Sequence, residues 1–212
     1  MTLDSFRSVL VVATEPLLGV LRTFRVSPNT VSVTAFGCAA VAGAAYYFAL
    51  GNSFALALAL VFLLLNGLLD GLDGALARQT GSASRYGDFL DHVIDRYADT
   101  IIVCGIFLGG FLRADLGALA LAGVLLASYL GTQAQAVGVG RIYAGVMGRA
   151  DRMIVLLLAT CVTLAYPGNL GFSGFEFPVL GWALLLIGAL SHVTAFQRIR
   201  YTRKKLLEES KK

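Results

Sequence analysis

Charged residues are scarce in this sequence of 212 residues. Only 14% of the residues are Asp, Glu, Lys or Arg, whereas 57% are hydrophobic, and the mean hydropathy is +0.75. Soluble globular domains carry about 25% charged residues, so this composition excludes an ordinary water-soluble core. We therefore expect a polytopic helical membrane protein, in which we find no repeat, low-complexity tract or soluble appendage.

Cysteine and histidine are almost as scarce. Cys38, Cys104 and Cys161 stand singly in three different apolar segments, without close pairs or metal-ligand spacing, and we interpret them as small buried hydrophobic residues. His92 and His192 are also isolated. Only His92 is of interest, because it lies between two aspartates and could contact a ligand or make a structural hydrogen bond.

Six apolar segments come near the twenty residues that a helix needs to cross about 30 Å of hydrocarbon. They are Val31–Leu50, Phe54–Arg78, Gly87–Gly110, Leu116–Val139, Met153–Tyr166 and Val179–Phe196. The fifth is short and can be extended back through Arg149. Residues 51–53 are expected to form a tight turn between antiparallel helices, and residues 167–169 end the fifth helix. The sequence thus predicts an all-α fold with six transmembrane helices in a single domain, residues 31–200.

The two ends of the chain differ from these spans. Residues 1–30 place leucines and Phe6 at roughly helical spacing, interrupted by charges and by Pro16, which predicts an amphipathic interfacial helix. A cleaved signal peptide is the alternative, but the segment lacks an uninterrupted apolar run and a small-residue cleavage site. Residues 201–212 are predicted to be a basic cytoplasmic tail attracted to anionic lipid headgroups. Because the basic residues are dispersed, we expect no nucleic-acid partner.

Four aspartates, Asp70, Asp73, Asp91 and Asp95, stand at the ends of two adjacent apolar segments. Carboxylates near a bilayer are costly unless they are paired, hydrated or bound to a cation. Each pair is three or four residues apart, so each projects from one face of its helix. Two such faces on antiparallel neighbours can converge on divalent cations, which prefer carboxylate oxygens. The spacing predicts a metal site.

A structural role for each aspartate is the alternative, because Arg78, Arg85 and Arg96 are near enough to pair with them. Four carboxylates on facing turns, beside glycines that leave room for a ligand, favour the metal site. Arg78 would then offer its planar guanidinium to a phosphate. A cation transporter is the alternative function. Against it, no acid continues the path across the membrane beyond Asp99.

The positive charges fix an orientation for six spans. With the N-terminus inside, sixteen of the seventeen Lys and Arg residues lie on one side of the membrane, and only Arg113 lies on the other. The positive-inside rule makes that side the cytoplasm. The four aspartates lie toward the same side. We therefore expect a multi-pass protein of the cell membrane whose site faces the cytoplasm.

These residues resemble the CDP-alcohol phosphotransferase family. Its motif, Asp-x2-Asp-Gly-x2-Ala-Arg-x8-Gly-x3-Asp-x3-Asp, is matched here without departure in residue or spacing by Asp70, Asp73, Gly74, Ala77, Arg78, Gly87, Asp91 and Asp95. Eight fixed positions over 26 residues make the motif highly specific. The six-span plan also resembles the family. Residues 27–30, Ser-Pro-Asn-Thr, are similar to the family's Pro-Asn entry to the first span, so the resemblance covers most of the chain.

The resemblance implies a membrane enzyme of phospholipid synthesis that moves the phosphatidyl or archaetidyl group of a CDP-lipid to an alcohol and releases CMP. It implies two divalent ions, Mg2+ or Mn2+, held by Asp70, Asp73, Asp91 and Asp95, with Asp95 also the base for the acceptor hydroxyl. It implies contacts to the CDP moiety from Asp73, Gly74, Ala77, Arg78 and Gly87, and more weakly from Asn29. Homodimers are common in the family, so a homodimer is expected.

The acceptor is less closely defined. Residues 148–152 resemble the segment that supplies arginine to inositol phosphate in phosphatidylinositol-phosphate synthases, which implicates Arg149 and Arg152, with Arg141 and Arg198 or Arg200 nearby. Helix-end anchoring is the alternative role for these arginines. Those synthases also carry basic residues late in the fourth span, where this chain has Gly131, Gln133 and Gln135. Glycerol phosphate and serine therefore stay open as acceptors beside inositol phosphate, and the lipid can be an ester or an ether.

Overall fold

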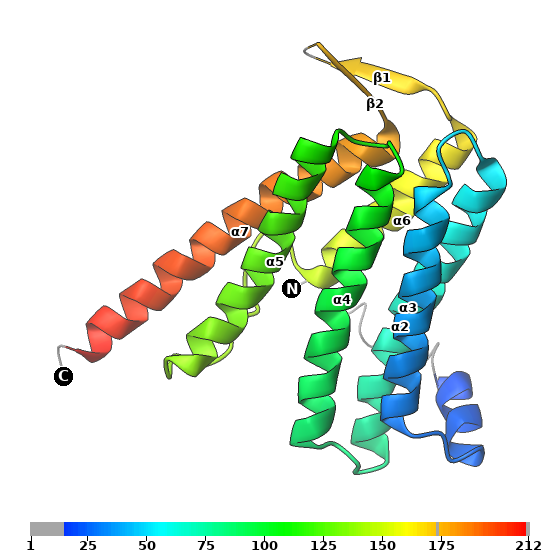
Figure 1. The fold of residues 1–212 in the computed structure, drawn as a ribbon. Coiled ribbons are helices and arrows are strands. Elements are labelled where there is room, and N and C mark those ends of the chain that lie inside the picture. The colour runs from blue at the N-terminus through cyan, green and yellow to red at the C-terminus, as the bar shows by residue number, and fades with distance from the viewer. Residues whose placement is uncertain (1–14, 173, 211–212) are drawn as a thin grey trace.

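A computed structural model describes residues 15–172 and 174–210. The described chain is mostly helical and carries one small hairpin (Figure 1). The elements are α2 (Pro28–Tyr47), α3 (Ser53–Gln79), α4 (Arg85–Leu108), α5 (Ala114–Ala136), α6 (Arg149–Ala165), β1 (Asn169–Phe172), β2 (Phe175–Pro178) and α7 (Val179–Glu209). Residues 15–23 are also helical. The expected all-α fold is confirmed.

The membrane-spanning character is clearest for four helices. By length and composition, α2, α3, α5 and α7 can each cross a bilayer. The other two are less apolar or shorter: α4 carries Asp91, Asp95, Arg96 and Asp99 within the stretch from 91 to 99, and α6 has 17 residues. Six spans therefore stay a prediction. The expected extension of the fifth segment back to Arg149 is confirmed, and α7 continues as a helix through most of the predicted tail.

The segment before α2 packs on α3. Leu18 is buried with Val31, Leu72 and Leu76, which form a small apolar cluster at this end of the molecule. Most of the predicted interfacial helix, residues 1–14, lies outside the described residues. Its amphipathic placement on the membrane therefore stays a prediction.

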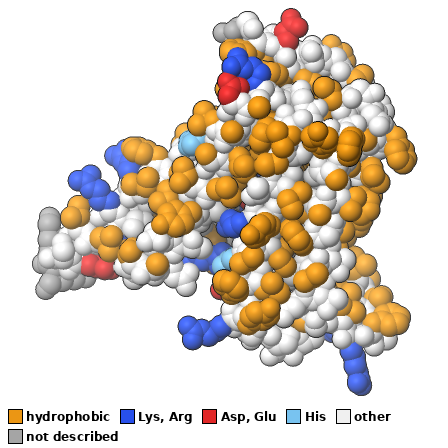
Figure 2. All heavy atoms as spheres, viewed as in Figure 1, with side chains coloured by type: hydrophobic (Ala, Val, Ile, Leu, Met, Phe, Trp, Pro, Cys, Tyr) orange, Lys and Arg blue, Asp and Glu red, His pale blue; other side chains and the backbone are white. Residues whose placement is uncertain are grey.

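The helices form two groups. α2 packs along both α3 and α4, while α5 packs along α7, and α6 contacts α3 on one side and α7 on the other. Figure 1 shows the groups meeting near the hairpin and diverging toward the opposite end, where the loop between α3 and α4 lies. In Figure 2 hydrophobic side chains cover much of the visible face, as expected for contact with lipid, and basic side chains and a histidine appear in the hollow between the two groups.

The close contact of α2 with α4 depends on glycine. A Cβ added to Gly43 of α2 would lie 2.6 Å from the carbonyl oxygen of Ile101, and Gly105 faces the Gly43 backbone even more closely. Small residues at helix crossings allow this approach in membrane proteins. The contact holds α4, and with it two of the four aspartates, against α2.

Two substitutions on α2 test this packing. Gly43→Ala should lower the free energy of unfolding in detergent by about 1–3 kcal/mol, because the backbone it meets cannot move aside cheaply. Gly37→Ala is the matched control, since a Cβ there meets nothing within 4 Å and alanine favours the helix. Thermal or denaturant unfolding measures both. Equal shifts for the two variants would contradict a limiting contact at Gly43.

The hairpin was not predicted from the sequence, which indicated only a break after the fifth helix. β1 pairs antiparallel with β2, with Asn169 opposite Pro178 and Phe172 opposite Phe175. The Trp182 indole of α7 donates to the Leu170 carbonyl at 2.9 Å. Arg113 lies over the Phe175 ring at 5.8 Å, so the single basic residue assigned to the far side lies at the hairpin end.

Candidate active site

Local capping sets where two of the helices around the site, α2 and α4, begin. Ser27 caps α2 by accepting from the Thr30 amide at 3.1 Å, with proline at the first helical position. Ser84 caps α4 by accepting from the Gly87 amide at 3.0 Å. Side-chain caps of this kind satisfy amides that have no intrahelical partner. Only five residues, 80–84, join α3 to α4, so the aspartates at the end of α3 face those at the start of α4.

The aspartates converge as predicted. Oxygens of Asp70, Asp73 and Asp91 all lie within 4.8 Å of one another, and Asp91, His92 and Asp95 form a second such group. The Ser32 hydroxyl of α2 donates to Asp73 at 2.6 Å, which orients that buried carboxylate. Three carboxylates at this spacing fit the oxygen ligand set of Mg2+ or Mn2+. The buried Oδ1 of Asp95 also has no well-aligned hydrogen bond in the described residues.

Arg149 reaches these carboxylates from a third helix. From the first residue of α6, its guanidinium lies 2.6 Å from Asp70 Oδ2 and 2.8 Å from Asp95 Oδ1, so it bridges α3 and α4. Asp99 lies 3.6 Å away on its other side. The sequence implicated Arg149 in acceptor binding, but gave no sign that it would pair with two of the motif aspartates.

Arg152 lies one turn farther along α6 and is only 5% exposed. Its guanidinium donates to Asp99 at 2.7 Å, one turn deeper on α4 than Asp95. A buried charge of this kind needs its partner, because neither charge has water to solvate it. Arg149 and Arg152 therefore share Asp99 as a neighbour, and Arg152 is the more buried of the two.

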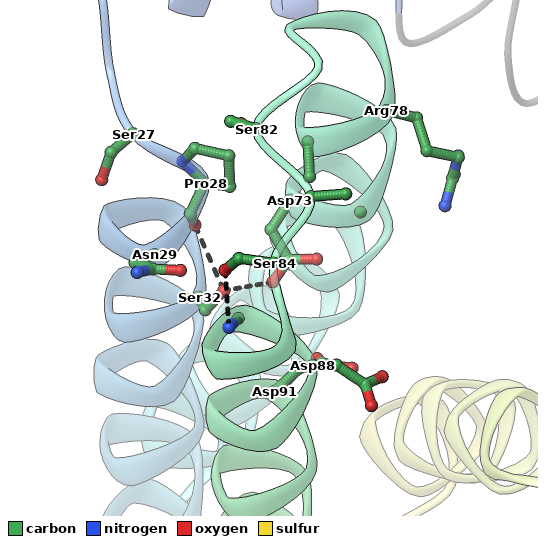
Figure 3. A pocket seen from close by; sticks show the side chains of 14 residues that line it. Ser27, Pro28, Asn29, Ser32, Asp73, Arg78, Ser82, Ser84, Asp88 and Asp91 are labelled. Carbon is green, nitrogen blue, oxygen red and sulfur yellow. Dashed lines mark hydrogen bonds between the residues drawn. The ribbon is translucent and has the colours of Figure 1, made fainter.

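A cavity of about 410 Å³ opens beside the aspartates, between α2, α3 and α4 (Figure 3). It is lined by Ser27, Pro28, Asn29, Ser32, Asp73, Gly74, Ala77, Arg78, Ser82, Ala83, Ser84, Gly87, Asp88 and Asp91. Every residue that the resemblance assigned to the CDP moiety is among them. Both glycines of the lining are closely approached by a neighbour: a Cβ on Gly74 would lie 3.3 Å from the Arg78 guanidinium, and one on Gly87 would lie 3.3 Å from Ser84 Oγ.

Arg141 is not among the residues that line this cavity, but it contacts Asp88, which is. Its guanidinium is 3.3 Å from His92 Nδ1 and 3.7 Å from Asp88, and it stacks on the Tyr143 ring at 4.8 Å. These contacts tie the loop between α5 and α6 to the start of α4. Arg141 and Arg149 thus bring positive charge to the aspartates from residues outside the cavity lining.

Two residues of the site, Ser32 and Asp99, were missed by sequence reasoning. Ser32 follows Asn29 by three residues, and Asp99 follows Asp95 by four, so helical spacing alone places each on the face of a predicted residue. Arg198 of α7 was predicted to lie near the acceptor arginines, and in the structure it contacts backbone carbonyls instead. Its guanidinium donates to the carbonyls of Ala127, Tyr143 and Ala144, which anchors the loop between α5 and α6.

Comparison with known proteins gives consistent relatives. The profile of the CDP-alcohol phosphatidyltransferase family matches residues 25–194. Archaetidylinositol phosphate synthase from Pyrococcus horikoshii is 35% identical over 188 residues, which cover 89% of each chain. Phosphatidylinositol phosphate synthase from Mycobacterium tuberculosis is 31% identical over 198 residues, covering 88% of this chain and 83% of the relative.

Crystal structures of the Mycobacterium tuberculosis synthase have the same fold. The structure with CDP-DAG bound aligns with a TM-score of 0.69 and 27% identity, covering 89% of this chain and 92% of that one. The structure in complex with manganese and citrate also has a TM-score of 0.69, with 28% identity over 89% of this chain and 88% of that one. From the motif, the converging carboxylates and these matches, we conclude that the chain is a metal-dependent transferase belonging to the CDP-alcohol phosphatidyltransferase family.

Proposed function

We propose that this enzyme transfers the phosphatidyl or archaetidyl group of a CDP-lipid to inositol phosphate and releases CMP. The observation that carries the proposal is that the aspartates border the cavity lined by Arg78 and also contact Arg149, with Arg141 close by at His92. A nucleotide headgroup and an anionic acceptor can therefore approach the same carboxylates. Relatives named archaetidylinositol phosphate synthase and phosphatidylinositol phosphate synthase support this acceptor. Membership of a transferase family argues against the transporter alternative.

The cavity suits the nucleotide end of the donor. A volume of about 410 Å³ lies within the usual range of small-molecule sites, roughly 300–1,000 Å³. We assign CDP contacts to Asn29, Asp73, Gly74, Ala77, Arg78 and Gly87, with Ser32 and Ser84 as added hydroxyl groups. Among the described residues, the Arg78 guanidinium makes no hydrogen bond or ion pair, so its planar fork is available to a phosphate.

Asp70, Asp73, Asp91 and Asp95 would hold two divalent cations, Mg2+ or Mn2+. When bound, such cations neutralise the pyrophosphate and stabilise the departing CMP. We assign Asp95 to the acceptor: its carboxylate accepts the proton of the attacking hydroxyl while the bond between the lipid phosphate and CMP breaks. Arg149, 2.8 Å from Asp95, lies where it can hold the acceptor close to that carboxylate.

Acceptor recognition is assigned to Arg141 and Arg149, because guanidinium groups bind phosphate through paired hydrogen bonds. The third predicted arginine, Arg152, is assigned a supporting part through Asp99, since its own guanidinium is buried. An acceptor that carries a phosphate uses both charges, whereas serine does not. This distinction favours inositol phosphate or glycerol phosphate over serine.

Release of CMP by the purified protein tests the proposed reaction. The assay supplies CDP-diacylglycerol or CDP-archaeol, Mg2+ or Mn2+, and a single acceptor chosen from inositol phosphate, glycerol phosphate, serine and inositol. We expect rapid release only with inositol phosphate, and the lipid donor that gives the higher rate names the backbone. Faster release with serine or unphosphorylated inositol than with inositol phosphate would overturn the acceptor assignment.

We also propose six spans in the cell membrane, with the site facing the cytoplasm and two chains forming a homodimer. The charge division supports the orientation.

In a variant with the native cysteines replaced by alanine, a cysteine at Ser84 or Lys205 should react with an impermeant maleimide only after the cytoplasmic face is opened. One at Glu176, exposed on the hairpin, should react in intact cells. Labelling of Ser84 and Glu176 positions from the same side would contradict six spans.

A further inference from the structure

We infer that Arg149 competes with one of the two cations for the aspartates, so that an anionic acceptor which draws the guanidinium away also strengthens binding of that cation. The inference rests on the proposed function, because it takes the four aspartates as the metal ligands. It goes beyond that function by giving Arg149 a second partner, the metal site itself, and by setting an order of binding.

Arg149 does not contact the four aspartates equally. Asp70, Asp73 and Asp91 bring their oxygens within 4.8 Å of one another, and Ser32 holds Asp73 in place. Within the described residues, Arg149 pairs with neither Asp73 nor Asp91. One group of three carboxylates is therefore already arranged for a cation. Binding a first ion there requires at most that Asp70 turn one oxygen away from Arg149.

Asp70 and Asp95 are the two carboxylates that Arg149 occupies most closely. Arg149 lies 2.6 Å from Asp70 and 2.8 Å from Asp95, and its side chain is only 18% exposed. Arginine stays charged at any pH relevant to a cell, so it cannot be neutralised to make way for a second cation. A cation that takes oxygens of both Asp70 and Asp95 must displace it. The competition is between two positive charges for the same pair of carboxylates.

The surroundings offer the guanidinium another position. Its Nε lies 3.6 Å from Asp99, which Arg152 holds in place from below, so Arg149 keeps an acidic neighbour when it leaves the other two. A phosphate on the outer side would give it a bidentate partner. An acceptor anion that binds Arg149 in this position releases Asp70 and Asp95 from the guanidinium. By linkage, the anion and the second cation each strengthen binding of the other.

Binding of Mn2+ alone, followed by electron paramagnetic resonance on the purified protein without CDP-lipid, tests the inference. The wild-type protein should bind one Mn2+ more tightly than a second. Arg149→Gln should tighten the second site about tenfold or more, and inorganic phosphate should tighten it in the wild type but not in the variant. Arg85→Gln is the control for charge, because Arg85 is exposed at the start of α4 and pairs with none of the four aspartates in the described residues.

Arg149→Lys covers the case in which the glutamine variant unfolds. Lysine keeps the charge, so the second site should stay weak, and thermal unfolding checks both proteins. If Mn2+ binds but the second affinity is the same in wild type and Arg149→Gln, or rises equally in Arg85→Gln, the competition is refuted. If the wild type binds no Mn2+, or Asp91→Asn binds it as well as the wild type, the proposed metal site itself fails.

Discussion

Asp91→Asn should abolish most CMP release, with turnover lower by about 10³-fold, equivalent to roughly 4 kcal/mol of transition-state stabilisation. Asp91 belongs to both groups of potential metal ligands, so its loss weakens each of them at once. An amide can still coordinate through its oxygen but carries no charge to offset that of the cation. CMP release at saturating substrates measures the fall, and Mn2+ titration should show weaker binding in parallel.

Excess chelator should have an equally large effect on the unaltered enzyme, and added Mg2+ or Mn2+ should restore turnover. Asp115→Asn is the matched control, because Asp115 is exposed at the start of α5 and pairs only with Arg113 in the described part of the chain. It should leave turnover unchanged. Undiminished turnover in excess chelator would remove the metal from the mechanism altogether.

The sequence predicted the parts of this molecule that follow from local spacing. The helix bounds agree to within about three residues, apart from the fifth helix, which starts at its predicted extension, and the sixth, which runs on to Glu209. Apolar run length fixes where a helix can exist, and serine or proline before the run fixes where it begins. The convergence of Asp70 and Asp73 with Asp91 followed from helical spacing and a short loop.

Contacts between distant segments were not predicted, because residue spacing along one helix carries no information about which other helices pack against it. Arg149 meets Asp70 and Asp95 only because α6 packs against α3, and this packing depends on the whole arrangement of helices. Arg152 had the same sequence context as Arg149, yet one turn of helix puts it in a buried pair with Asp99. The hairpin was missed because four-residue strands are too short to show an alternating pattern.

Asp95→Asn should lower turnover by about 10²-fold or more while the affinity for CDP-lipid stays close to normal, because the change removes a base and keeps the shape of the side chain. Asp95 lies on the acceptor side, against Arg149, whereas the proposed CDP contacts lie in the cavity lined by Asp73 and Arg78. Steady-state CMP release gives kcat, and binding of a CDP-lipid to the variant gives its affinity.

Two further readouts separate a base from a metal ligand, since Asp95 is proposed to be both. Mn2+ binding should weaken far less in Asp95→Asn than in Asp91→Asn, because Asp95 belongs to one ligand group and Asp91 to two. Loss of a base should also remove the fall in kcat that protonation of that base causes at low pH. A turnover defect that higher Mn2+ concentrations fully restore would make Asp95 a ligand only.

Asp99→Asn is the matched comparison, one turn deeper on the same face of α4 and similarly buried. Asp99 pairs with Arg152 at 2.7 Å, so this substitution leaves a buried guanidinium without its charged partner and should lower the melting temperature. Asp95→Asn should instead lower kcat with little change in melting temperature, because Arg149 keeps Asp70 as a charged partner at 2.6 Å. Near-normal kcat in Asp95→Asn would move the base elsewhere, and Asp91 would then be the next carboxylate to test.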